Sequence, residues 1–214
     1  MTVTTAEYDA LPLLPYSEAR RQMRTGDILL FHSSGFGSRL VEWATDSLWC
    51  HAAFVWNMER IDRVLLLESV DTYGVRCMAL SNKINGSLAD PKPYPGKLLL
   101  ARHQDFPHPA PEAGIHKMTE FAIDRLGFPY SSEELARVAL RIAKGMAGVP
   151  VRGELDPTSA YICSEYVAKC YEAMGITLAP DKDGFIAPAD IANDPKVFAV
   201  CALGPDPVAK TAAA

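Results

Sequence analysis

The sequence predicts an α+β fold in which strands come first and helices later, with a final strand returning at the end. Short apolar runs bounded by turn residues fill the first half of the chain, as is typical of strands. In the second half, apolar residues recur at helical spacing, and one more strand-like run, Val197–Ala202, follows them. The 214 residues show no internal repeat, so we expect one domain, and two at most.

The N-terminal part begins with a proline-punctuated segment, residues 1–16, which we expect to lie on the surface as an arm. A short helix is predicted over Ser17–Arg24. The continuous apolar run Ile28–Phe31 then predicts a buried strand. A glycine-containing loop follows, after which Ser38 can cap a helix that continues to about Thr45.

Three further strands are predicted before the helical half. Two of them, His51–Asn57 and Val64–Ser69, are joined by a polar stretch and form a hairpin. The third is Lys97–His103. Residues 70–96 are rich in Pro, Gly and Asn, and we therefore expect them to form a loop.

The helical half contains three predicted helices and a short helical turn. An apolar face repeats along Glu112–Leu126. A capping box at Ser131–Glu134 leads into a second helix that reaches about Met146. The third helix is predicted over about Ser159–Met174, and the short turn over Asp190–Asn193.

We therefore expect an N-terminal arm and short helix over residues 1–24, one main domain over 25–203, and a frayed tail over 204–214. The tail is too poor in apolar residues to pack.

The composition excludes several classes of protein. With 49% hydrophobic and 22% charged residues, the chain has the mix of a globular protein rather than of a disordered one. The net charge of −5 argues against a nucleic-acid partner, which basic proteins bind through the phosphates. The longest apolar runs are strand-sized, so membrane contact is not expected. The first residues lack the basic start and the apolar core of a signal peptide. The five cysteines include no C-x-x-C pair, which suits a reducing compartment. We therefore expect a cytoplasmic location.

Cys163 is the first candidate for chemistry. It lies near the start of the third helix, where backbone N–H groups carry partial positive charge and favour a thiolate over a thiol. The same N–H groups can hold an oxyanion. However, Cys163 and Cys170 also share one apolar stripe of that helix, and a cysteine considered alone is more often a small core residue.

The strand hairpin adds His51 and Glu68. If Met58 pairs with Ile61, then His51 stands directly opposite Glu68, and a slip of two residues still leaves them diagonal neighbours on one face. A carboxylate in that place can accept the imidazole N–H and stabilise the imidazolium. A half-buried contact that only satisfies two polar groups is the alternative.

Three aromatic residues are candidates for binding substrate: Tyr161, Trp49 and Tyr73. Each can instead be an ordinary packed side chain. The remaining histidines show no metal-ligand spacing, so no metal site is expected, and no cofactor is expected either.

Several motifs together resemble the circularly permuted NlpC-type papain-like cysteine hydrolases, and the YiiX/YebB-like proteins among them. The matching segments are Thr25–Phe31, Cys50–Val55, Leu67–Ser69, Gly127–Tyr130, Tyr161–Val167 and Ala187–Ile191. The ordered set is more specific than any one motif. One departure is Ser131, where an acidic residue is expected in the family.

The resemblance implies a small antiparallel sheet or half-barrel packed against a helical layer. It also implies a cysteine peptidase or amidase with Cys163 as nucleophile, His51 as general base and acid, and Glu68 as the orienting residue. The permuted enzymes have the reversed order His, polar residue, Cys, and this chain has the same order. The implied substrates are small peptides or amides, including cell-wall-type peptides with γ-glutamyl and diamino-acid links, which are cleaved through a thiol acyl-enzyme.

Two alternatives stay open at this point. The same Cys–His site could serve a lipid acyl hydrolase or acyltransferase, so a lipid substrate is not excluded. A non-catalytic binding module would instead have His51 and Cys163 too far apart to cooperate.

Overall fold

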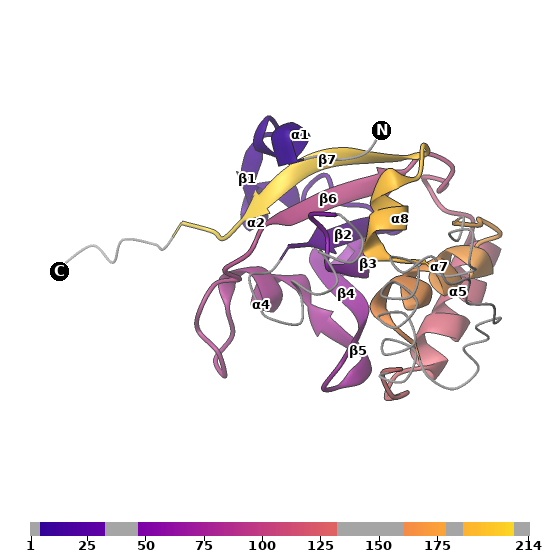
Figure 1. The fold of residues 1–214 in the computed structure, drawn as a ribbon. Helices are drawn as coiled ribbons and strands as arrows, with labels where there is room; N and C mark the ends of the chain where they lie inside the picture. The colour runs from indigo at the N-terminus through magenta and orange to yellow at the C-terminus, as the bar shows by residue number, and fades with distance from the viewer. Residues whose placement is uncertain (1–4, 33–46, 132–160, 179–185, 208–214) are drawn as a thin grey trace, which may run out of the picture.

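The computed structural model describes residues 5–32, 47–131, 161–178 and 186–207, which form one sheet with helices on both faces (Figure 1). The seven strands lie in the order β1-β7-β6-β2-β3-β4-β5. β1 runs parallel to β7, and all other neighbouring pairs are antiparallel. The α+β class is confirmed, while the sheet is larger than the small antiparallel sheet expected, and it is mixed.

The strands are β1 (Leu13–Pro15), β2 (Asp27–Phe31), β3 (His51–Met58), β4 (Arg63–Val70), β5 (Gly74–Ala79), β6 (Leu98–His103) and β7 (Val197–Gly204). The helices are α1 (Thr5–Asp9), α2 (Tyr16–Ala19), α4 (Leu80–Asn85), α5 (Glu112–Asp124), α7 (Cys163–Ala173) and α8 (Pro188–Asn193), with a 3₁₀ turn η1 (Glu59–Ile61). The five predicted strands correspond to β2, β3, β4, β6 and β7. The helices expected after Ser38 and after Ser131–Glu134 fall outside the described residues.

The prediction of a loop over residues 70–96 is wrong in its first half. Gly74, at a φ of +66°, closes a tight turn after β4, and β5 then returns along β4. α4 follows directly and buries Leu80 and Ile84 against the sheet. The turn residues that suggested a loop therefore mark a hairpin and the end of a short helix.

Both ends of the chain join the sheet more closely than expected. Within the predicted arm, β1 pairs with β7 at the sheet edge, and the helix after it is shorter and begins earlier than Ser17–Arg24. Beyond β7, the Asp206 carboxylate accepts hydrogen bonds from the Ser17 N–H and the Asn85 amide. The predicted fraying therefore does not begin at residue 204.

Each face of the sheet buries its own apolar cluster. On one face, Ile28, Leu30, Phe54 and Leu67 pack with α5, α7 and α8. On the other, the alternate residues of the same strands pack with α2 and α4; these include Leu29, Phe31, Ala53, Val55 and Leu66. Because strand side chains alternate between faces, a central strand covered on both sides is apolar throughout, as β2 is.

α7 lies against β3 and β4, beside α5 (Figure 1). The Tyr166 hydroxyl donates a 2.9 Å hydrogen bond to the Ala122 carbonyl of α5, and the Tyr171 hydroxyl donates one to the Gly26 carbonyl before β2. These two buried hydroxyls fix α7 to its neighbours, and its first residue is thereby held beside the start of β3. Among the described helices, none has the length and apolarity needed to cross a bilayer.

Candidate active site

His51 is the first residue of β3, and the chain before it is anchored to β2. The Cys50 backbone N–H and thiol both donate to the Phe31 carbonyl oxygen, at 2.9 and 3.2 Å. The imidazole packs at an angle on the Phe31 ring, with the two centroids 4.9 Å apart. The side chain stays 18% exposed, so this backbone anchoring holds a histidine at the border between core and solvent.

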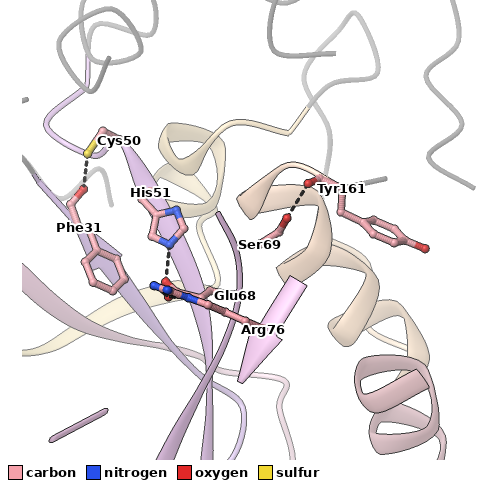
Figure 2. Close-up of polar contacts among 7 residues, drawn as sticks. All are labelled: Phe31, Cys50, His51, Glu68, Ser69, Arg76 and Tyr161. Carbon is pink, nitrogen blue, oxygen red and sulfur yellow. Dashed lines mark hydrogen bonds and ion pairs between the residues drawn. The ribbon is translucent and has the colours of Figure 1, made fainter. Parts of the chain in front are cut away.

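Glu68, on β4, is the partner of His51 (Figure 2). Its Oε2 lies 2.8 Å from His51 Nε2, and its side chain is completely buried. The register differs from the expected one by two residues, because Met58 pairs with Arg63 rather than with Ile61. The two residues are therefore diagonal neighbours on one face, as the two-residue slip predicted, rather than directly opposite.

Arg76, on β5, completes the surroundings of the carboxylate, and sequence reasoning missed it. It stands directly opposite Glu68 in the β4–β5 ladder. Its Nε and Nη2 donate to Glu68 Oε1 at 2.9 and 2.6 Å (Figure 2). The signal that could have found it is the Gly74 turn, since a tight hairpin closed there pairs residue 68 with residue 76.

Cys163 was predicted near the start of a helix that begins at about Ser159; it is the first residue of α7, which begins later than predicted, and it is 6% exposed. Three hydrogen bonds hold the start of this helix. The Ser69 hydroxyl donates to the Tyr161 carbonyl at 2.6 Å, the Ser164 hydroxyl donates to the Ile186 carbonyl at 2.6 Å, and the Ile162 N–H donates to the Glu165 carboxylate at 3.3 Å. The helix start is therefore tied to β4 and to the segment before α8.

The Cys163 thiol lies close enough to the His51 imidazole for each group to shift the pKa of the other. Since Nε2 is engaged with Glu68, the ring nitrogen that faces the sulfur is Nδ1. The backbone N–H groups of Ala52 and Ser164 also lie near the Cys163 sulfur and lower the pKa of the thiol. The structure thus brings together the three residues that the sequence singled out, in the order Cys163, His51, Glu68.

The protonation of this group follows from its surroundings. Burial disfavours the charged imidazole, but the Cys163 thiolate and the Glu68 carboxylate outweigh it and raise the pKa of His51 to about 9. Burial likewise opposes ionisation of Cys163, yet His51 and the two backbone donors lower the pKa of the thiol. The favoured state is therefore a thiolate–imidazolium pair.

Glu68 remains ionised although no part of its side chain is exposed. Burial acts to raise its pKa, but the hydrogen bond from His51 and the charges of His51, Lys83 and Arg76 lower the pKa of Glu68 to about 2. Lys83, on α4, lies over the rings of Phe31 and Tyr94, at 5.3 and 5.4 Å from their centroids. Three cationic groups thus surround one buried carboxylate.

Other thiols of the chain differ from Cys163. Burial raises the pKa of Cys77, Cys170 and Cys201, the last to about 11. Cys170, which shares the apolar stripe of α7 with Cys163, is fully buried in the core. The core-residue interpretation therefore fits Cys170, while Cys163 lies in a polar setting that activates a thiol.

The three aromatic candidates differ in their exposure and packing. Tyr161 and Trp49 are buried: Tyr161 packs with Phe121, Phe128 and Tyr166 and accepts a 3.1 Å hydrogen bond from Arg125, and Trp49 packs on Tyr8. Tyr73 is 67% exposed at the β4–β5 turn, with the Arg76 guanidinium 5.0 Å from its ring centroid. Of the three, Tyr73 is the one open to a ligand in solution.

The described residues contain no group of three or more His, Cys, Asp and Glu that could hold a metal ion. At the candidate site, both oxygens of Glu68 are engaged by Arg76 and His51, and one nitrogen of His51 is engaged by Glu68. Of the described side chains, only Cys163 and His51 Nδ1 are left to face a cation there, which is fewer ligands than a protein metal site has.

Comparison with known proteins bears on the fold. No protein-family model matches the chain, and no curated protein matches its sequence. The structure is similar to the crystal structure of the metalloprotein YiiX from Escherichia coli O157:H7 (DUF1105), with a TM-score of 0.58 and 19% sequence identity over 86% of this chain and 99% of that one. At this identity, the likeness establishes a YiiX-like fold for the chain.

Proposed function

We propose that the protein is a cysteine hydrolase that cleaves an amide bond through a thiol acyl-enzyme, on a permuted papain-like fold. The observation that carries the proposal is the position of the His51 imidazole, which lies 2.8 Å from the buried Glu68 carboxylate and close enough to the Cys163 thiol for each of the two groups to shift the pKa of the other. A nucleophile, a base and a residue that orients the base are the parts that such a reaction needs.

The first half of the reaction starts with the thiolate. Cys163 Sγ has given its proton to His51 Nδ1 and attacks the carbonyl carbon of the substrate. The oxyanion that forms is stabilised by the helix start, where the Cys163 N–H lies in the first turn and has no acceptor within α7. His51 Nδ1 then protonates the leaving amine, the C–N bond breaks, and the acyl group stays on sulfur as a thioester.

The second half returns the enzyme to its starting state. His51, now neutral, removes a proton from a water molecule, and the resulting hydroxide attacks the thioester carbonyl. The C–S bond breaks, the carboxylic acid leaves, and Cys163 again holds a thiolate beside the imidazolium. Glu68 accepts the Nε2–H of His51 in both halves and so keeps the ring in one tautomer and orientation.

The substrate is a small peptide or amide; the motif resemblance favours cell-wall-type peptides with γ-glutamyl and diamino-acid links. The influence of Cys163 and His51 on each other's pKa places the two groups close together, which argues against the non-catalytic module. The YiiX neighbour is described as a metalloprotein, but the donors of this site do not fit a metal, and no step of the proposed reaction uses one.

The test is alkylation by iodoacetamide from about pH 5 to about pH 9, with each cysteine followed by peptide mass spectrometry. We expect Cys163 to react at low pH, where Cys77 in the same sample does not, and His51→Ala to abolish the difference. Equal reactivity of the two thiols at every pH would refute the proposal. A panel of γ-glutamyl peptides and acyl esters, with Cys163→Ala as control, then separates amide hydrolysis from lipid acyl chemistry.

A further inference from the structure

Glu68 is held on both sides, and each side has a different partner. Its Oε2 accepts from His51 Nε2 at 2.8 Å, and its Oε1 accepts from Arg76 Nη2 and Nε at 2.6 and 2.9 Å. The side chain of Glu68 is completely buried, so water cannot replace either partner. Without Arg76, a buried carboxylate would rotate toward whatever donor is left, or would take up a proton.

Arg76 is well placed to prevent that movement. It lies directly opposite Glu68 on β5, in a ladder that is hydrogen-bonded along its whole length from Leu65–Ala79 to Val70–Gly74. Its guanidinium is held by two hydrogen bonds that converge on one oxygen of Glu68, and it lies over the Tyr73 ring, 5.0 Å from the ring centroid. It is also 28% exposed, which lowers the cost of keeping a cation there.

We propose that Arg76 is a positioning residue of the active site: by binding Oε1 it fixes the Glu68 carboxylate, so that Oε2 keeps the His51 ring turned toward Cys163. This inference rests on the proposed function and adds to it a fourth residue, which touches neither the nucleophile nor the base. Arg76 acts through Glu68 alone.

The charges around His51 allow positioning to be distinguished from a simple effect of charge. Among the described residues, Glu68 on β4 and Cys163 on α7 carry the charges that act on His51, while Arg76 on β5 and Lys83 on α4 act on Glu68. If Arg76 acted only as a cation, its removal would make the site less positive and would raise the pKa of both Cys163 and His51. If Arg76 positions Glu68, its removal weakens the anion beside His51, so the pKa of His51 falls while that of Cys163 rises.

The experiment uses the full chain and two readouts: the pH dependence of Cys163 alkylation by iodoacetamide, and the titration of His51 followed by NMR of its ring. The variants are Arg76→Gln, Arg76→Lys, Glu68→Gln and the double variant Arg76→Gln with Glu68→Gln. Arg102→Gln is a matched control, because Arg102 holds the buried carboxylate of Asp27 by two hydrogen bonds of 2.6 and 2.9 Å on β2 and β6.

We expect Arg76→Gln to slow alkylation of Cys163 about tenfold at low pH, to shift the acid limb of the profile up by about one pH unit, and to lower the pKa of His51. Arg76→Lys, which keeps the charge and loses the planar fork, should fall between wild type and Arg76→Gln. In the Glu68→Gln background, Arg76→Gln should change the rate less than about twofold. Arg102→Gln should lower the melting temperature and leave both titrations unchanged.

The inference is overturned if Arg76→Gln lowers only the melting temperature, or if it raises the pKa of both groups, or if its effect persists in full when Glu68 is already glutamine. If Arg76→Gln does not fold, the same two measurements on Arg76→Lys, alkylation of Cys163 and titration of His51, take its place. Failure of the proposed function is a separate result, because it would appear in the wild-type protein as a Cys163 no more reactive at low pH than Cys77.

Discussion

The Ser69 hydroxyl donates a 2.6 Å hydrogen bond to the Tyr161 carbonyl oxygen, and this bond joins two parts of the candidate site that are far apart in sequence (Figure 2). Ser69 follows Glu68 on β4, and Tyr161 lies two residues before Cys163. Both side chains are buried, so the bond is shielded from water. It sets where the start of α7 lies relative to the strand that carries the carboxylate.

Ser69→Ala should therefore loosen the start of α7. Removing the hydroxyl leaves the Tyr161 carbonyl without this donor in the core, and we expect a loss of about 1–3 kcal/mol in the free energy of unfolding. Urea unfolding measures this loss, and alkylation near pH 6 should slow about threefold or more if the helix start moves.

Ser164→Ala is the comparison for that variant, because it removes a hydrogen bond of the same length, from the Ser164 hydroxyl to the Ile186 carbonyl, and leaves the bond to β4 in place. A larger loss of Cys163 reactivity in Ser164→Ala than in Ser69→Ala would show that the bond to β4 does not set the position of the nucleophile.

His51→Ala should return Cys163 to the behaviour of a buried thiol. Burial alone raises the pKa of the thiol, and His51 is the largest opposing influence. We expect the alkylation rate of Cys163 near pH 6 to fall by at least about a hundredfold, since the thiolate fraction falls with the rising pKa. His116→Ala, an exposed change on α5, is the control and should leave the alkylation rate unchanged. If His51→Ala and His116→Ala slow alkylation equally, His51 has no specific effect on Cys163.

The sequence predicted the pairing of His51 with Glu68 better than it predicted the residues around that pair. The apolar runs located β2, β3, β4, β6 and β7, and period-two alternation placed His51 and Glu68 on one face. The register was off by two because the β3–β4 connection is a 3₁₀ turn closed by Asp62 at a φ of +51°, which takes four residues instead of two. Nothing in the polar stretch around Glu59 specifies that turn.

Arg76 was missed for a different reason. Gly74 and the polar residues before it mark a loop and a hairpin turn equally well, and β5 is only half-buried, so its apolar signal is weak. The pairing of Glu68 with Arg76 follows from the register once the hairpin is known. The buried positions of Tyr161 and Trp49 could not be predicted either, because an aromatic residue next to a candidate catalytic motif has the same sequence signal whether it faces a ligand or the core.

The proposed reaction should have a bell-shaped pH–rate profile. The acid limb reports protonation of the thiolate, and the alkaline limb reports loss of the proton from His51, whose pKa is raised to about 9. On a cleaved amide substrate, kcat/KM should fall above about pH 9. In Glu68→Gln the alkaline limb should move to lower pH, because the carboxylate that stabilises the imidazolium is gone. If the alkaline limb does not move in Glu68→Gln, then Glu68 does not stabilise the protonated form of His51.

Tyr161→Phe tests whether the Tyr161 hydroxyl belongs to the site or to the core. The hydroxyl accepts a 3.1 Å hydrogen bond from Arg125 Nε within a cluster of buried rings. We expect a loss of about 1 kcal/mol in the free energy of unfolding, with the pH dependence of Cys163 alkylation and the KM for substrate unchanged. A raised KM at unchanged stability would instead place the hydroxyl on the substrate.

The acid stability of the protein should depend on Glu68. Its pKa is lowered from the ordinary value of 4.5 to about 2 in the folded state, so folding favours the ionised form. This stabilisation of the folded state is fully present above about pH 4.5. It is lost as the pH falls toward 2, where Glu68 is protonated in the folded state as well. The difference between the two pKa values corresponds to about 3 kcal/mol in the free energy of unfolding. Urea unfolding at about pH 7 and about pH 3 should therefore show a smaller loss of stability on acidification in Glu68→Gln than in wild type. Glu120→Gln, an exposed change on α5, is the control and should lose as much stability on acidification as wild type. If Glu68→Gln also loses as much stability as wild type, the Glu68 carboxylate is not held ionised by its partners.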